Sequence, residues 1–374
     1  MRHPSFVASA ASALLLAGTA AAEEQDRDRP GPPAIEAVAS IASSSSAPAD
    51  PFVFLDVAAT FPLGRGFGAI VRPYAHRLAG GDWEAEMYQL QLRYQSRTRV
   101  PVRVDAGIIT SPLGLGTLEL RPDLSAAIKA PFYYHSPLPA FDAAAPRVLL
   151  MSGGYPLGAL VSLSGSRWDA RGGVTDSSPA RPRNVLARDA PPALRQVLAG
   201  GGVTPVAGLR AGVGLAYGAY APAGGSTVAN GTYEGELADA EAIGPHASPS
   251  PLQAMVFAIE GEYAFGHTRL SGEWVRNRFE GASGNAVARG YFVQAVQTLT
   301  PRIFASVRTV GASAPVAPGG GGARKTMTTT EVTAGYRLGR TLALRAGYFT
   351  SRRFEAGRRT HTALASVVWA QRWF

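Results

Sequence analysis

The sequence predicts an all-β protein, and three observations lead to that class. Apolar and polar residues alternate with a period of two along most of the chain, which is the pattern of strands with two different faces. The 374 residues include 43 Gly and 28 Pro, too many helix breakers for a helical bundle. No stretch of useful length has the 3.6-residue period of an amphipathic helix, so the sheet is expected to be antiparallel.

The first fifty residues do not share this alternation. Residues 1–22 are predicted to be a signal peptide, because an apolar run ends in the small residues Ala20–Ala22, which suit a cleavage site. The alternative, an N-terminal helix of the folded domain, is disfavoured by the acidic, Pro-rich sequence that follows. Residues 23–50 are predicted to be a disordered linker, since a polar stretch followed by a Ser/Ala tract has little apolar surface to bury. The folded domain is expected over residues 51–374.

Within that domain the strands can be assigned one by one. In the clearest of them, residues 88–94, Tyr88 shares one face with two leucines and Tyr94, while glutamines and Arg93 share the other. The predicted strands are residues 52–61, 67–78, 88–94, 102–108, 146–165, 168–175, 195–205, 209–217, 255–263, 267–278, 285–298, 302–312, 326–338, 342–348 and 360–374. Single-chain barrels need an even number of strands, and dividing the segment 146–165 into two strands near Tyr155 would raise the count from 15 to 16. We therefore predict about 16 strands, with 14 as the next alternative.

Three features favour a transmembrane β-barrel over a soluble sandwich or barrel. The strands are long enough for a tilted crossing of a bilayer. Aromatic residues, among them Trp83, Tyr88, Trp168 and Tyr263, sit at strand ends, where membrane interfaces select them. Short turns also alternate with long loops, as in outer-membrane barrels. The short turns are expected at 63–66, 96–101, 164–167, 204–208, 266–268, 300–302 and 339–340, and the long loops at 110–145, 176–194, 220–252 and 313–325.

Two segments carry a resemblance to a known family. The last strand ends in Trp373 and Phe374, and it resembles the terminal strand of Gram-negative outer-membrane barrels. The segment 103–114, RVDAGIITSPLG, is similar to a strand and the following loop of anion-selective and general porins. These resemblances imply a porin-like barrel in the outer membrane of a Gram-negative bacterium, surrounded by outer-membrane lipids. They also imply insertion by the barrel-assembly machinery, with Trp373 and Phe374 as the assembly signal. A homotrimer is left open.

If the bulky face meets lipid, the opposite face lines the lumen. Asp105 is expected to pair with one of Arg93 and Arg103 and to leave the other exposed to permeating anions. The predicted pore-lining residues are Arg72, Arg93, Arg103, Asp105, Arg171, Arg210, Glu260, Glu262, Arg308, Arg337 and Arg345. Further inward carboxylates are expected at Asp56, Asp169, Glu273 and Glu331, and a further arginine at Arg269. Arg–carboxylate pairs that stiffen the wall are the alternative for each of them.

The loop 110–145 contains five Pro and four aromatic residues, an unusual composition for a flexible connection. By resemblance to porins, it is expected to fold into the lumen and narrow it, with Glu119, Arg121, Asp123 and Lys129 as the candidate constriction residues. The alternative is an ordered surface loop that packs on its neighbours or on a trimer partner.

These observations lead to a porin-like channel for small hydrophilic solutes and ions. A weak preference for anions is expected, carried chiefly by Arg93 and Arg103; the net charge is +9, and 34 of the 36 basic residues are arginine. A non-conducting structural or adhesin-type barrel is the alternative, and a hydrolase active at the barrel rim is a distant third. The absence of Cys excludes thiol and Cys–metal chemistry, and the histidines form no catalytic or metal-binding motif. No cofactor, metal, enzymatic activity or nucleic-acid partner is expected.

Overall fold

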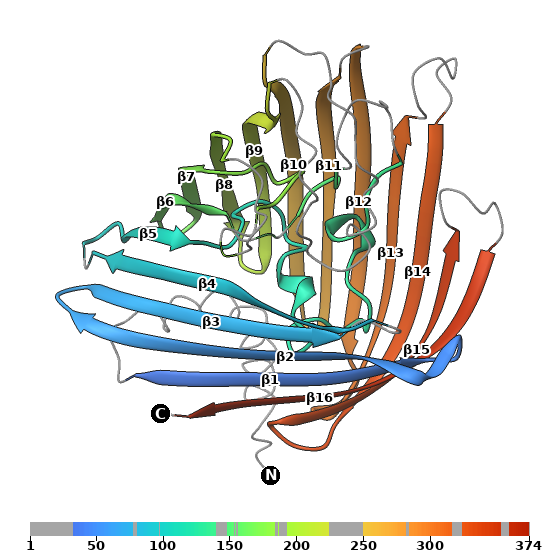
Figure 1. The fold of residues 1–374 in the computed structure, drawn as a ribbon. Helices are drawn as coiled ribbons and strands as arrows, with labels where there is room; N and C mark the ends of the chain where they lie inside the picture. The colour runs from blue at the N-terminus through green and yellow to red at the C-terminus, as the bar shows by residue number, and fades with distance from the viewer. Residues whose placement is uncertain are drawn as a thin grey trace.

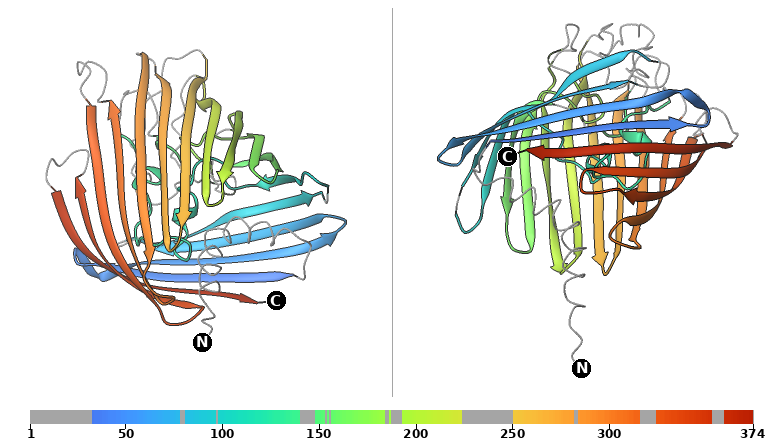
Figure 2. Two further views of the ribbon diagram at one scale, coloured as in Figure 1. Left: turned by 180° about the vertical axis from the view of Figure 1, so that it is seen from behind. Right: turned by 90° about the horizontal axis from the view of Figure 1, so that it is seen from below.

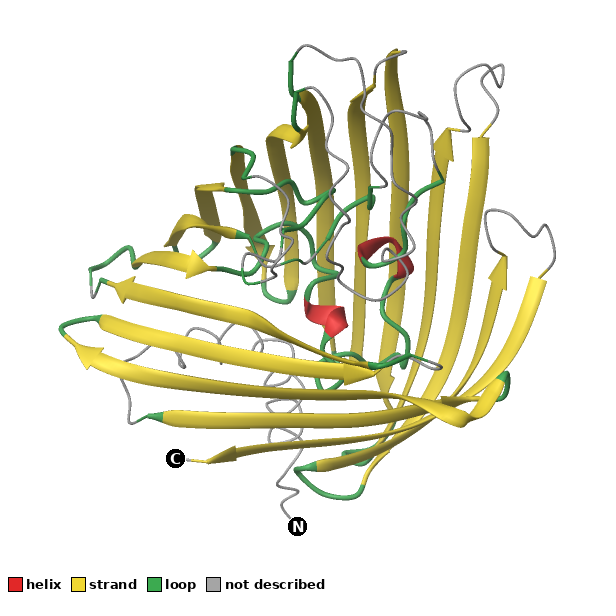
Figure 3. Cartoon of the chain, viewed as in Figure 1, coloured by secondary structure: helices red, strands yellow, loops and turns green. Residues whose placement is uncertain are grey.

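A computed structural model shows that the chain forms a closed barrel of antiparallel strands (Figure 1). The structure describes residues 33–77, 81–96, 98–139, 148–152, 154, 156–183, 186, 193–223, 250–281, 284–315, 324–352 and 359–373. No helix within these ranges is long and apolar enough to cross a membrane. The two helices that the structure describes are single 3-10 turns, and both lie inside the barrel (Figure 3).

Sixteen strands are formed by the described residues, which confirms the predicted fold class and strand number. The strands are β1 (Ala34–Ser44), β2 (Ala47–Gly64), β3 (Phe67–Arg77), β4 (Trp83–Gln95), β5 (Val102–Ile108), β6 (Leu157–Ser164), β7 (Trp168–Thr175), β8 (Gln196–Val206), β9 (Leu209–Ala221), β10 (Leu252–Phe265), β11 (Thr268–Gly281), β12 (Gly284–Thr298), β13 (Ile303–Pro315), β14 (Arg324–Arg337), β15 (Leu342–Arg352) and β16 (Arg359–Trp373). Each strand pairs with the next, and β1 pairs with β16 to close the sheet (Figure 2).

The first strand corrects the prediction of a disordered linker over 23–50. Ala34–Ser44 of this segment form β1, which fills the gap between β2 and β16, and residues 47–50 begin β2, whereas residues 23–32 lie outside the described residues. Its Ser/Ala composition hides a weak alternation in which Ile35 and Ile41 face outward while Val38 and Ser40 are buried. The edges of β2 and β16 would otherwise expose unpaired backbone groups to lipid, so even a weakly apolar segment is held there. The predicted signal peptide, residues 1–22, lies outside the described residues.

This strand also resolves the strand count. The other fifteen strands correspond one to one with the predicted ones, and the segment 146–165 contains a single strand, β6. The seven predicted short turns all connect strands at one end of the barrel, and the predicted long loops connect strands at the other. In the turn after β2, Gly64, Arg65 and Gly66 all have positive φ, a conformation that favours glycine.

The two faces of the wall follow the predicted alternation. Outward residues are mostly bulky and apolar, and on β4 Leu92 is 59% exposed whereas its inward polar neighbour Gln91 is 4% exposed. Tyr88 is an exception, because a bulge opposite Arg72 and Pro73 shifts the alternation by one residue. Its side chain is therefore buried inside, beneath the guanidinium of Arg72 at 4.2 Å from the ring centre, and the prediction of an outward Tyr88 is wrong.

The exposed apolar exterior makes a prediction about stability in a bilayer. Val293 on β12 is 61% exposed in the middle of the outer face, so V293R should lower the free energy of unfolding by roughly 2–4 kcal/mol in phospholipid vesicles. T326R, near the long-loop end of β14, should cost about 1 kcal/mol or less. Urea unfolding of the refolded variants measures both values, and equal losses would contradict a membrane-facing exterior.

Candidate functional site

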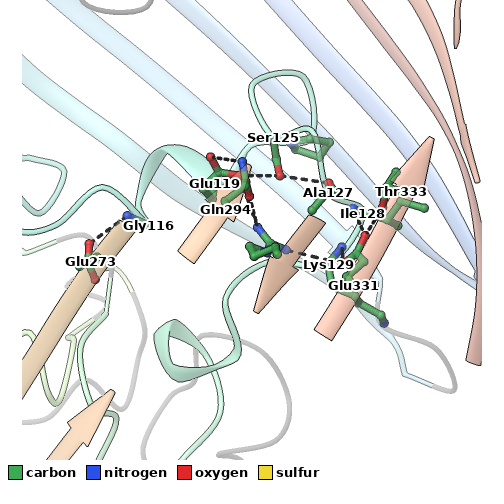
Figure 4. Close-up of polar contacts among 12 residues, drawn as sticks. Gly116, Glu119, Ser125, Ala127, Ile128, Lys129, Glu273, Gln294, Glu331 and Thr333 are labelled. Atoms are coloured by element: carbon green, nitrogen blue, oxygen red, sulfur yellow. Dashed lines mark hydrogen bonds and ion pairs between the residues drawn. The ribbon is translucent and has the colours of Figure 1, made fainter. Parts of the chain in front are cut away.

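The described residues of the connection between β5 and β6, which are 109–139, 148–152, 154 and 156, run through the interior of the barrel. Its two 3-10 turns, Leu118–Leu120 and Phe132–Tyr134, lie within the ring of strands (Figure 3). Side chains and backbone groups of this inner loop contact inward residues of β11 to β15 (Figure 4). We call the described part of residues 109–156 the inner loop.

One side of the inner loop is apolar and packs against an apolar part of the wall. Loop residues Leu113, Phe132, Tyr133, Leu150 and Met151 are almost fully buried. They contact the inward faces of β8 to β13, which carry alanine, valine, leucine and aromatic side chains at these positions. The wall residues of this cluster are Leu198, Ala216, Tyr220, Ala221, Leu252, Ala254, Val256, Ala258, Val275, Phe279, Ala286, Ala288, Phe292, Val310, Ala312 and Ala314. The lumen is thus apolar along this arc, where sequence alternation alone predicted a polar wall.

The carboxylate of Glu273 on β11 anchors the middle of the inner loop. It accepts hydrogen bonds from the hydroxyls of Tyr133 at 2.8 Å and Tyr134 at 2.9 Å, and from the backbone N–H of Gly116 at 3.2 Å. Burial, and after it the charge of Glu273, raises the pKa of both tyrosines well above its ordinary value, so the phenols stay protonated and donate. Tyr134 lies so close to Gly116 that a Cβ there would collide with its ring.

Glu119 forms a second anchor, at the first 3-10 turn. Its carboxylate accepts hydrogen bonds from Ser125 Oγ at 2.8 Å and from Gln294 Nε2 at 3.2 Å. Two arginines of the wall, Arg269 on β11 and Arg308 on β13, each approach it to 3.4 Å. Because Arg308 is 2% exposed, its charge is held away from water and depends on the nearby carboxylate of Glu119.

The third anchor joins the loop to β14 and β15. Glu331 accepts the backbone N–H groups of Ile128 and Lys129, the latter at 3.1 Å. The guanidinium of Arg345 donates to the carbonyl oxygens of Pro122, Ser125 and Ala127 at 2.9–3.1 Å, while its Nε donates to Ser366 on β16. Both sequence-predicted residues, Glu331 and Arg345, are therefore buried beneath the loop.

The remaining loop charges reach toward the opposite wall. Arg121 makes a two-pronged hydrogen bond with Asp123 at 2.9 and 2.6 Å and lies 3.5 Å from Glu36 on β1. Burial lowers the pKa of Arg121, but the carboxylates of Asp123 and Glu36 more than compensate, so the net shift is upward. The side chain of Lys129 is exposed and has no ion pair within the part of the chain that the structure describes.

The predicted pore-lining residues on β3 to β5 lie on the inner face but do not pair as expected. Arg72 binds Asp56 on β2 with both prongs of its fork. Asp105 contacts Arg93 at 2.7 Å through one oxygen and Arg103 at 3.1 Å through the other. The prediction that one of these arginines stays without a partner is wrong, because the carboxylate has two oxygens: Arg93 is its cross-strand partner, and Arg103 lies two residues before it on the same face of β5.

A second mixed cluster lines β7 to β10. Arg210 contacts Glu260 at 2.6 Å and Asp169 at 3.1 Å, and Arg171 shares Glu260 at 3.2 Å. The guanidinium side chains are 21% and 27% exposed, so they are in contact with solvent inside the barrel. The glycines of β8 leave room for this cluster, since a Cβ on Gly202 would collide with Arg210.

Beneath the inner loop, at the short-turn end, a cavity of about 610 Å³ remains. Glu262, Arg269 and Arg337 line it together with apolar residues of the wall. Arg269 lies 3.8 Å from Glu262 as well as near Glu119. Arg337 lies over the ring of Phe304 at 4.7 Å and donates to the carbonyl of Pro301. This cavity shows that the loop does not fill the lumen down to the short turns.

The terminal residues can be placed in part. Trp373 lies at the end of β16, is 40% exposed on the outer face and contacts Trp369 with ring centres 5.9 Å apart. Phe374 lies outside the described residues. Among described residues no group of three or more His, Asp or Glu side chains is arranged to hold a metal ion.

Sequence reasoning missed several members of the site. Tyr133, Tyr134, Gln294 and Asn277 all bind across the loop–wall contact, and Asn277 donates to the carbonyl of Leu150 at 2.9 Å. The adjacent tyrosines in a Pro-rich loop were the available signal, since buried hydroxyls need fixed acceptors. For Gln294 and Asn277, the sequence contains no signal of a role in the site beyond their inward position on a strand.

Comparisons with known proteins agree on the fold. No family model and no curated protein matches the chain. Among solved structures, OmpF of Salmonella typhi aligns over 91% of this chain and 97% of its own with 8% identity and a TM-score of 0.57. An anion-selective porin from Comamonas acidovorans aligns over 90% and 98% with 12% identity and a TM-score of 0.56.

The fold is that of a porin. OmpT of Vibrio cholerae, an outer membrane protein, also aligns over 91% of this chain and 97% of its own, with 10% identity and a TM-score of 0.55. The predicted porin-like β-barrel is thereby confirmed at the level of fold, and the exterior of the barrel is apolar.

The anchors make a prediction about the inner loop. R345M removes the donor to three loop carbonyls, and hydrogen bonds to a charged group contribute about 1.5–3 kcal/mol each. Trypsin should then cleave after Lys129 roughly ten- to a hundredfold faster, because the loop opens more often. R337M is the matched control, since Arg337 contacts Phe304 and Pro301 and should leave the rate unchanged. Equal cleavage in both variants would contradict the anchor.

Proposed function

We propose that the protein is a passive channel for small hydrophilic solutes and ions and is not an enzyme. One observation carries the proposal. The charged side chains of the clusters on β4–β5 and β7–β10 are partly exposed inside the barrel. Charged groups contact solvent there only if water enters the lumen. The cavity beneath the inner loop supports continuity of that water toward the short-turn end.

We further propose that the inner loop forms the constriction. Arg121 and Asp123 face the β1–β2 side of the lumen, and Lys129 is exposed. Permeating solutes would pass between this edge of the loop and the wall formed by β2 to β7. The apolar arc formed by the inward faces of β8 to β13 would be closed to these solutes because the inner loop covers it.

A weak anion preference is proposed from the arginines in the short-turn half of that wall, whereas Glu84 and Glu86 of β4, beside His76 and Tyr74, add negative charge nearer the long-loop end. Arg93, Arg103 and Asp105 together carry one net positive charge, and Arg72 with Asp56 is neutral. Lys129 adds another positive charge across the lumen. Such a field selects ions weakly, since each arginine is partly compensated by a carboxylate.

A non-conducting barrel is the second candidate, and one observation favours it. The inner loop and the apolar arc together build a core like that of a soluble protein. If this core closed the remaining passage, the barrel would serve a structural or adhesive role. Conductance across a planar bilayer separates the two candidates.

The proposed setting is the outer membrane of a Gram-negative bacterium. The exposed apolar exterior would contact outer-membrane lipids, and the barrel-assembly machinery would insert the protein. A homotrimer is compatible with this setting, and one solved structure of Vibrio cholerae OmpT with a TM-score of 0.52 is described as a trimer form.

Conductance and selectivity test the proposal together. Folded wild-type protein should give steps of ion current in a planar bilayer, and their absence would favour the non-conducting alternative. In a salt gradient, D105N should raise the anion-to-cation permeability ratio and R93A/R103A should lower it, each by roughly two- to fivefold. R302Q, at an exposed short turn, is the control. If the ratio is the same in all variants, these residues are wall supports only.

The proposed assembly signal has a separate test. Deletion of Phe374 should slow insertion by the assembly machinery and leave unfolded protein in the periplasm, whereas a conservative F374Y should insert normally. Heat-modifiable migration of membrane fractions on gels reports the folded share. Normal insertion of the deletion variant would remove the role assigned to the terminal residues.

A further inference from the structure

Four arginines form a basic patch on the outside of the barrel, near its long-loop end. Arg276 and Arg278 lie on β11, Arg289 on β12 and Arg324 on β14, and all four are exposed on the outer face. Arg276 and Arg289 are direct cross-strand partners in register. Arg324 donates to Ser313 Oγ on β13 at 2.8 Å. It also reaches across β13 to donate to the carbonyl of Val287 on β12, which is the register partner of Arg278.

Among the described residues, no carboxylate lies within ion-pair distance of this patch. None of the four arginines takes part in an ion pair in the described part of the chain. β12 and β13 contain no acidic residue, and neither do the adjoining connections, residues 282–283 and 316–323. Glu280, on the same face of β11, accepts the backbone N–H of Gln253 instead. Like charges directly opposite each other in a sheet are destabilising, so an anion bound beside Arg276 and Arg289 would stabilise the pair.

The patch lies at the edge of the apolar exterior. On the neighbouring strand β10, outward residues from Phe265 to Met255 are apolar, and this stretch covers about 25 Å of height at a typical strand tilt. Arg278 pairs with Met255, at the upper end of that stretch. Directly below the arginines, Trp274 and Tyr291 are cross-strand partners, and such aromatic residues belong at the membrane interface. The guanidinium groups therefore lie at the depth of lipid headgroups.

We propose that this patch binds the phosphate groups of a phosphorylated lipid in the leaflet at the long-loop end, of the chemical class of lipid A. Arginine binds phosphate through two parallel hydrogen bonds, and four adjacent guanidinium groups match a headgroup that carries two phosphates. Acyl chains of the same molecule would lie on the apolar exterior below Trp274 and Tyr291. The bound lipid would supply the missing counter-charge for Arg276 and Arg289.

The test compares two variants that lose the same charge. R276Q/R278Q/R289Q/R324Q removes the patch, whereas R99Q/R167Q/R302Q/R340Q removes four arginines from the short turns at the other end. Lipid A is titrated into each folded protein in detergent, and native mass spectrometry measures the bound fraction. We expect the patch variant to bind lipid A roughly tenfold more weakly or worse, and the turn variant to bind it like wild type.

The other outcomes overturn the proposal. An equal loss in both variants would indicate general attraction to net charge, and unchanged binding in the patch variant would exclude the site. Full displacement of lipid A by millimolar inorganic phosphate would assign the patch to free anions. A changed oligomeric state without loss of lipid binding would assign it to a contact between copies of the chain.

Two controls keep the result interpretable. If the fourfold variant fails to fold, as judged by heat-modifiable migration, R276Q/R289Q tests the same cross-strand pair with half the charge removed. Ion conductance of the same preparations is recorded alongside, because it depends on the lumen and not on the outer face. Lost lipid binding with normal conductance supports the patch, and absent conductance with intact lipid binding contradicts only the channel proposal.

Discussion

The alternation of the wall determines where charge can go in this protein. The exterior of the strands is apolar, so almost every charged side chain within the height of the barrel points into the lumen. There the arginines and carboxylates have to pair, because a charge removed from bulk water is costly without a partner. The pairs of Arg72 with Asp56 and of both Arg93 and Arg103 with Asp105 follow from this constraint. The basic patch is the exception, and it lies where the apolar band ends.

The inner loop uses the same constraint. Its position depends on Glu273, Glu331 and Arg345, inward residues of the wall that bind loop backbone and tyrosine hydroxyls rather than each other. Glu119 offers the reverse arrangement, a loop carboxylate between two arginines of the wall. A polar lumen can therefore hold a folded segment, because the buried charged groups of these anchors find their partners on the other side of the contact. The apolar arc then adds packing where the wall carries small side chains.

Much of the fold could be predicted from the sequence, since strong alternation fixes both the strand and its face. The prediction of strands and faces failed where the alternation was weak or locally broken. β1 was missed because alanine and serine carry little contrast, and Tyr88 was misplaced because a bulge cannot be read from residue types. In the site, inward orientation of Glu273, Glu331 and Arg345 was predictable, but their partners were not. A contact between residues over 200 positions apart, such as Arg345 with Ser125, leaves no periodic trace.

The seam between β1 and β16 has a consequence for how the molecule is made. Its register joins Ile35 to Trp373, so the first and last strands must find each other across more than 300 intervening residues. Until the final strand is in place, β15 and β1 each present an open edge with unpaired backbone groups, which invites pairing with other chains. Loop-closure entropy makes such distant pairing slow. The half-built sheet therefore needs protection from aggregation for longer than a protein of this size with local contacts would.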